Sequence, residues 1–129
     1  MSQRPPCDHH VIDGRIHEFV LNEISPRAVD MIFDIAADLL QQDATKPYPG
    51  LIDARIGSLP LNYMLKRARE VARQYPNRVQ ARVAVLGTSG TVVHTAMVLL
   101  RPILPIRLYK PAEREQALAW LRESLVSSK

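Results

Sequence analysis

The residues best suited to chemistry form a short run of small polar side chains between an apolar strand-like stretch and an apolar helix-like stretch. The run is Gly87-Thr88-Ser89-Gly90-Thr91. Backbone N–H groups in such a turn can surround an anion, and the following helix dipole favours negative charge. The run lacks the Lys-Ser/Thr ending of a P-loop and the spaced glycines of a dinucleotide fingerprint. It is therefore a candidate anion- or nucleotide-binding turn, with a plain helix cap as the alternative.

Two further groupings could support catalysis or metal binding. Ser89 and His94 could form a nucleophile and base, but no G-x-S-x-G context or third member accompanies them. The run Cys7-Asp8-His9-His10 contains metal-binding side chains, but no second ligand group follows at a structural spacing. We therefore expect no catalytic residues, no metal site and no cofactor, so the chain is predicted not to be an enzyme.

A serine and a basic helix offer surface for regulation. Ser58 precedes Pro60 at the start of a predicted helix, where it could cap the helix or accept a phosphate. The same helix carries Lys66, Arg69 and Arg73, a candidate surface for a protein partner. Aromatic and glycine-rich elements do not interleave with these cations, so we predict no dedicated nucleic-acid site.

Composition sets the broad class of the protein. The chain has 129 residues, 47% of them hydrophobic, and a formal net charge of +4, which fits one globular domain. No apolar run approaches the roughly 20 residues that span a bilayer, so no membrane insertion is expected. The first residues do not resemble a secretory signal and there is one cysteine, which favours a cytoplasmic location. We predict a flexible arm over residues 1–9 and a single α/β domain over 10–129.

Alternating strand-like and helix-like segments predict the architecture. Asp13-Gly14 separates two strand candidates within residues 10–23, as expected for a hairpin. Ser25-Pro26 begins a helix whose Asp30, Asp34 and Asp38 share the side opposite the apolar face. This acidic side is either a solvated face or one that meets a nearby cation or a basic partner. The remaining predicted strands cover 51–56, 82–86 and 106–109, and the remaining helices cover 60–75, 92–100 and the stretch after Lys110-Pro111. The helix over 92–100 is apolar on more than one side, which predicts a central position or a homodimer interface.

The order of these segments resembles a known family. Ile106-Arg107-Leu108-Tyr109-Lys110 and the later Ala117-Leu118-Ala119-Trp120-Leu121 look like the closing strand and helix of SpoIIAA-like proteins, a branch of the STAS family. The segments 51–55 and 82–87 resemble earlier strands of that family. The resemblance implies a mixed four- to five-stranded sheet with helices packed largely on one face.

The same resemblance implies a regulatory role. Anti-sigma-factor antagonists of this family carry a phosphorylatable serine in an Asp-Ser-Ser/Thr-Gly motif, whereas Ser58 here has no adjacent aspartate. We therefore expect a non-catalytic regulatory or adaptor domain that binds a protein partner. The alternative is a domain that binds a small anion, nucleotide or lipid-like ligand, either at Gly87–Thr91 or in an apolar pocket.

Overall fold

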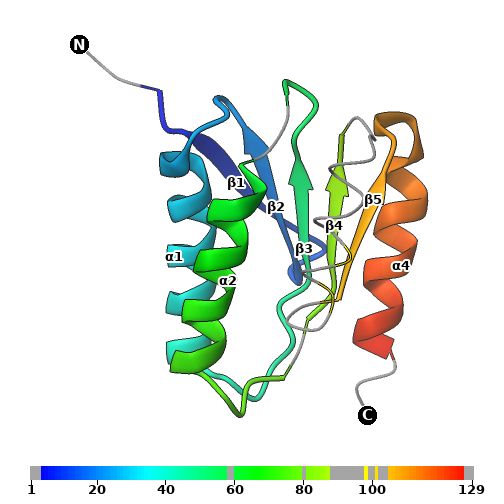
Figure 1. Ribbon diagram of the computed structural model, residues 1–129. Helices are drawn as coiled ribbons and strands as arrows, with labels where there is room; N and C mark the ends of the chain where they lie inside the picture. The colour runs from blue at the N-terminus through cyan, green and yellow to red at the C-terminus, as the bar shows by residue number, and fades with distance from the viewer. Residues whose placement is uncertain are drawn as a thin grey trace.

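A five-stranded mixed sheet forms the centre of the molecule (Figure 1). The computed structural model describes residues 4–57, 60–79, 81–87, 98, 101 and 105–126. The strands lie in the order in which they occur in the sequence, and β1 runs antiparallel to β2 while all later pairs are parallel. Their bounds are β1 (Cys7–Ile12), β2 (Ile16–Leu21), β3 (Gly50–Asp53), β4 (Val83–Leu86) and β5 (Ile106–Tyr109). The predicted α/β class and mixed sheet are confirmed.

The first two strands form the predicted hairpin. Asp13 and Gly14 both have positive φ, at 54° and 68°, which is the backbone of a type I′ turn and explains the Asp-Gly sequence. The hairpin begins earlier than the sequence indicated, because β1 starts at Cys7 and the Cys7 side chain is fully buried. Residues 7–9 of the predicted flexible arm therefore belong to the sheet.

The helices begin where local sequence favours them, with one exception. Helix α1 (Pro26–Gln42) is capped by Ser25, whose Oγ accepts a hydrogen bond from the backbone N–H of Ala28 at 3.2 Å. The N-cap of α2 (Leu61–Gln74) is Pro60, which has no side-chain cap hydrogen bond. Ser58, the predicted cap, lies outside the described residues.

The end of the chain also follows the prediction. A 3-10 turn, η1 (Pro111–Glu113), leads into α4 (Arg114–Val126), and Glu113 Oε1 accepts a hydrogen bond from the backbone N–H of Lys110 at 2.8 Å. The helix predicted over 92–100 falls mainly on residues that are not described. None of the helices within the described ranges is long and apolar enough to cross a membrane.

Helices cover both faces of the sheet. Helices α1 and α2 lie side by side on one face, and α4 lies on the other (Figure 1). The predicted one-sided packing thus applies to two of the three described α-helices. Strand β2 is buried on both faces, because Ile16 and Phe19, which point to opposite faces, are both buried. The α4 layer is the reason, since it covers the face that would otherwise meet solvent.

An arginine joins the two helices that share a face. Arg67 Nη2 of α2 lies 2.7 Å from Asp34 Oδ1 of α1, and Arg67 Nε lies 3.3 Å from Asp30 Oδ1, an ion contact with no hydrogen-bond geometry. The Tyr63 hydroxyl donates a hydrogen bond to Asp30 at 2.6 Å. Two members of the acidic side of α1, Asp30 and Asp34, therefore meet a cation.

Candidate functional site: an apolar pocket between the helix pair and the sheet

The clearest candidate site is a cavity of about 130 Å³ between the α1 and α2 pair and the sheet. Strands β2, β3 and β4 form its floor, the two helices form its roof, and the segments before β3 and β4 close one end. Most lining side chains are aliphatic or aromatic. The described lining residues are His17, Phe19, Ile32, Phe33, Ala36, Leu39, Leu40, Tyr48, Gly50, Ile52, Met64, Ala68, Val71, Arg78, Val79, Ala81 and Val83.

Small residues at facing positions account for the empty space. Gly50 lies on the floor, and Ala36 and Ala68 lie on the two roof helices. A Cβ atom placed on Gly50 would come no closer than 3.8 Å to the His17 carbonyl oxygen and 4.0 Å to Val83 Cγ2, both ordinary contacts. The fold would accommodate a side chain at this position, so the glycine leaves open volume that protein interiors normally fill.

A pair of histidines forms the polar part of the floor. His17 lines the pocket, and its Nδ1 shares a proton with His9 Nε2 across 2.9 Å. The His9 ring also stacks on Phe19, with ring centres 4.9 Å apart. Burial lowers the pKa of both imidazoles, and each is lowered further by a neighbouring histidine. The pair is therefore held in its neutral form, with one imidazole donating to the other.

The other polar lining groups are already hydrogen-bonded within the protein. The Tyr48 hydroxyl donates to the backbone carbonyl of Asp43 at 2.8 Å, and burial raises the pKa of that phenol. Arg78 Nη1 donates to the carbonyl of Tyr75 at 3.1 Å and to that of Ala72 at 3.5 Å, at the end of α2. The pocket can therefore bind apolar surface, but its described residues include no activated nucleophile.

None of the candidate site residues that the structure describes, Gly87, Lys66, Arg69 and Arg73, lines this pocket. Gly87 is buried, and its N–H donates to the Tyr109 carbonyl at 3.0 Å within the sheet, so that group is not available to an anion. Thr88, Ser89, Gly90 and Thr91 lie outside the described residues. Lys66, Arg69 and Arg73 are exposed on α2 and point away from the pocket, whereas Met64 and Ala68 of the same helix line it.

Two buried carboxylates on the α4 side were missed by the sequence reading. Glu18 Oε2 accepts a hydrogen bond from Arg114 Nη2 at 2.6 Å. Both oxygens of Asp53 are bound by Arg55, at 2.8 Å from Nε and 2.8 Å from Nη2. Each carboxylate thus has its own guanidinium, which is how proteins tolerate buried charge. Within each pair the carboxylate and the guanidinium neutralise each other's charge.

The thiol of the single cysteine, Cys7, is also shielded. Burial, with a smaller contribution from Asp8, raises the pKa of the Cys7 thiol to about 11, so it is protonated at neutral pH. No group of three or more His, Cys, Asp or Glu side chains with metal-binding geometry occurs among the described residues.

Sequence reasoning anticipated an apolar pocket only as one alternative and did not locate it. His17 lies on a covered face of the sheet, although it is a polar residue beside apolar Ile16 in the sequence. The available signal was Gly50, a residue without a side chain at the start of a buried strand. No protein-family model, curated protein or solved structure matches the chain.

Proposed function

We propose that this domain is a non-catalytic binding protein for a small apolar molecule, held in the pocket between the α1 and α2 pair and the sheet. The pocket itself carries the proposal, because about 130 Å³ of space lies against a lining of mostly apolar side chains. An engineered apolar cavity of roughly 150 Å³ stays dry and takes up benzene. A cavity of similar size in a natural fold has the volume to do the same.

Thermal unfolding with added ligand tests this function. A molecule that binds the native state alone stabilises it by about 2.7 kcal/mol at 100 times its Kd. We expect toluene, phenol or indole to raise the Tm of the wild-type domain. The same compounds should leave the Tm of an Ala36→Leu variant unchanged, because the added side chain fills the pocket.

The matched control places the same substitution where it touches nothing. Ala119 is exposed on α4, so an Ala119→Leu variant should respond to the compounds as the wild type does. Equal responses of the Ala36→Leu and wild-type domains would show that the compounds act elsewhere. No response of any of the three proteins to any of the compounds would remove the proposed function.

A regulatory or adaptor domain that binds a protein partner is the second candidate. Lys66, Arg69 and Arg73 are exposed along one side of α2, and no ion pair joins them to another described side chain. Such a stripe fits an acidic partner. In a pull-down from lysate, a K66E/R69E/R73E variant should lose a specific partner that a control variant, R4E/R15E/K46E, keeps.

We also propose that the domain is related to the SpoIIAA-like branch of the STAS family and that it is cytoplasmic. The element order and the antiparallel first strand support the relationship. The packing of α4 on the second face departs from the one-sided packing that the relationship implies. Phosphorylation of Ser58 and dimerisation through residues 92–100 remain predictions. Mass spectrometry of Ser58 and light scattering at high concentration would test them.

A further inference from the structure

We infer that the ligand of the pocket is an amphipathic monocarboxylate, whose apolar body lies in the pocket and whose carboxylate binds the Arg78 guanidinium. This inference rests on the proposed function and specifies its ligand class. Among the described lining residues, Arg78 is the one side chain with a permanent charge, and none carries a carboxylate. Because arginine stays protonated in proteins, the lining combines apolar surface with a fixed positive charge.

The protein holds the Arg78 guanidinium in place without removing its charge. Nη1 donates to the Tyr75 carbonyl at 3.1 Å and to the Ala72 carbonyl at 3.5 Å, at the end of α2. These acceptors are neutral groups, and the partial negative charge of a helix C-terminus amounts to only about half of a unit charge. Because the contacts restrict the side chain, binding of an anion costs less side-chain entropy here than at a mobile arginine.

The charge lies at an end of the pocket that reaches solvent. Arg78 is half-buried, and Val79, which also lines the pocket, is 38% exposed. The backbone N–H of Val79 donates to the Ala44 carbonyl at 3.1 Å, which fixes this segment beside the end of α1. Phe19 and Ile52, in contrast, are buried on the floor. A ligand can therefore place its apolar body over the floor while its carboxylate stays partly hydrated beside Arg78, which avoids most of the cost of burying a charge.

The other polar side chains of the lining are poorer partners for a carboxylate. Tyr48 gives its hydroxyl proton to the Asp43 carbonyl, so its oxygen is left as an acceptor. His17 Nδ1 is paired with His9 Nε2 at 2.9 Å, and burial, with a smaller contribution from His9, lowers the pKa of His17 below its usual 6.5. A carboxylate in the pocket is therefore directed to Arg78, where charge-assisted hydrogen bonds are roughly twice as strong as neutral ones.

The experiment compares phenylacetate with phenylacetamide, two ligands of matched shape that differ in charge. Binding is measured at pH 7.5 by ligand-observed NMR, and Ala36→Leu identifies signal that does not come from the pocket. We expect the wild-type domain to bind phenylacetate about 10-fold more tightly than phenylacetamide, or better. Arg78→Gln should abolish this preference, and Arg78→Lys should keep part of it. The matched control Arg69→Gln, on the exposed side of the same helix, should keep all of it.

A second measurement on the wild-type domain decides the matter even if Arg78→Gln does not fold. Phenylacetate should shift the NMR signal of the Arg78 Nε–H group, and phenylacetamide should shift it less. Phenylacetate that binds no more tightly than phenylacetamide, a preference that survives in Arg78→Gln, or an unshifted Arg78 signal would overturn the inference. Absence of Ala36→Leu-sensitive binding by both compounds and by toluene, phenol and indole would instead overturn the proposed function.

Discussion

The two faces of the sheet differ in how completely side chains fill the space against the helices. On the α4 face, Ile16, Leu51 and Leu121 are fully buried, and each buried carboxylate has an arginine partner. On the α1 and α2 face, a cavity remains between side chains that are otherwise apolar. Packing without voids maximises dispersion contacts, whereas a void forfeits them. From this comparison we expect a truncation to cost more on the α4 face, whereas the other face keeps space that a ligand could occupy.

A leucine truncation on each face tests this contrast most strongly. Leu121→Ala on α4 should lower the free energy of unfolding by about 3–5 kcal/mol, because the closely packed side chains around it cannot move into the new void. Leu40→Ala on α1 should cost about 2–3 kcal/mol, because Leu40 already borders the cavity and has fewer neighbours to lose. Urea denaturation of both variants measures the difference. Equal losses would show that the two faces are packed alike.

Removal of a buried ion-pair partner should have the next largest effect. Arg114→Met leaves the Glu18 carboxylate, whose side chain is 11% exposed, without its guanidinium. We expect a loss of about 1–3 kcal/mol, less than for a fully buried pair because the Arg114 side chain is 39% exposed. The double variant E18L/R114M removes both charges and should recover most of the loss. A double variant as unstable as Arg114→Met would show that packing, not charge, holds this region together.

Filling the cavity should stabilise the protein by a smaller amount. Ala36→Leu adds apolar atoms to a space that already exists, and cavity-filling changes commonly add about 0.5–2 kcal/mol. Ala119→Leu adds the same atoms at an exposed position and should change the stability by less than about 0.5 kcal/mol. Guanidinium denaturation compares the two. A destabilised Ala36→Leu variant would mean that the pocket is more rigid than its volume implies.

Acid should weaken the pocket side of the molecule by the smallest amount. Burial lowers the pKa of His9 and His17 in the folded state from the ordinary value of 6.5. As the pH falls below 6.5, the unfolded chain takes up protons first, so the free energy of unfolding decreases until the folded-state pKa values are passed. Tm values between pH 7.5 and 5 should show this slope, reduced in His17→Phe and mostly retained in His10→Gln, which removes only the smaller cause of the lowered pKa of His9. An unchanged slope in His17→Phe would assign the acid sensitivity to other groups.

The elements of the fold could be read from the sequence because their signals are local. Asp13-Gly14 specifies a turn, Ser25-Pro26 specifies a helix start, and the apolar run before Gly87 specifies a central strand. Each signal depends on backbone preferences within a few residues. The start of β1 was missed because Cys7-Asp8-His9 has no alternation of its own, and its strand conformation comes from pairing with β2.

The candidate site could not be predicted in the same way because it is a property of packing between distant segments. Ala36, Gly50 and Ala68 are ordinary small residues in sequence, and only the fold places them around one space. The pairing of Glu18 with Arg114 also spans most of the chain. The run Gly87–Thr91 attracted attention because its signal is local, whereas the sequence signal of the pocket is a single glycine, Gly50.

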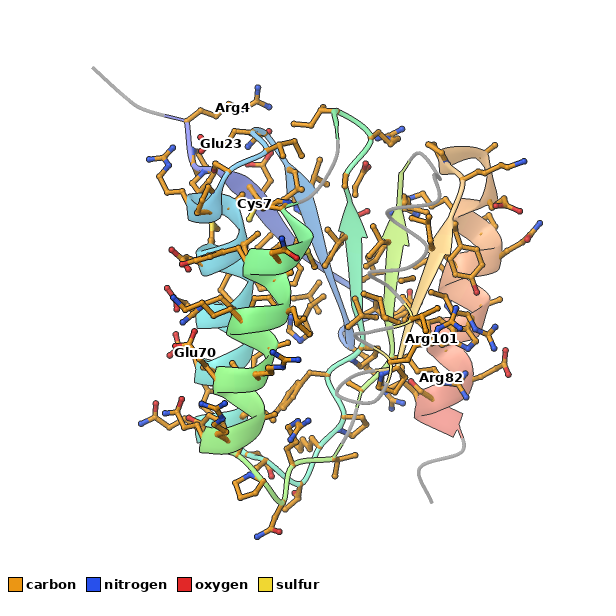
Figure 2. All side chains as sticks on the ribbon, in the orientation of Figure 1. Arg4, Cys7, Glu23, Glu70, Arg82 and Arg101 are labelled. Carbon is orange, nitrogen blue, oxygen red and sulfur yellow. The ribbon has the colours of Figure 1, made fainter. Side chains whose placement is uncertain are left out.

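The position of the single tryptophan makes the two faces distinguishable by spectroscopy. Trp120 lies on the α4 side, with the guanidinium carbons of Arg82 and Arg107 at 5.1 and 4.6 Å from the ring centre. Arg82, which Figure 2 shows beside α4, also donates to the Trp120 carbonyl at 2.8 Å. Intrinsic fluorescence therefore reports release of α4 from the sheet and is insensitive to occupancy of the opposite face. A ligand that raises the Tm without altering native emission carries the optical signature of a molecule held on the far side.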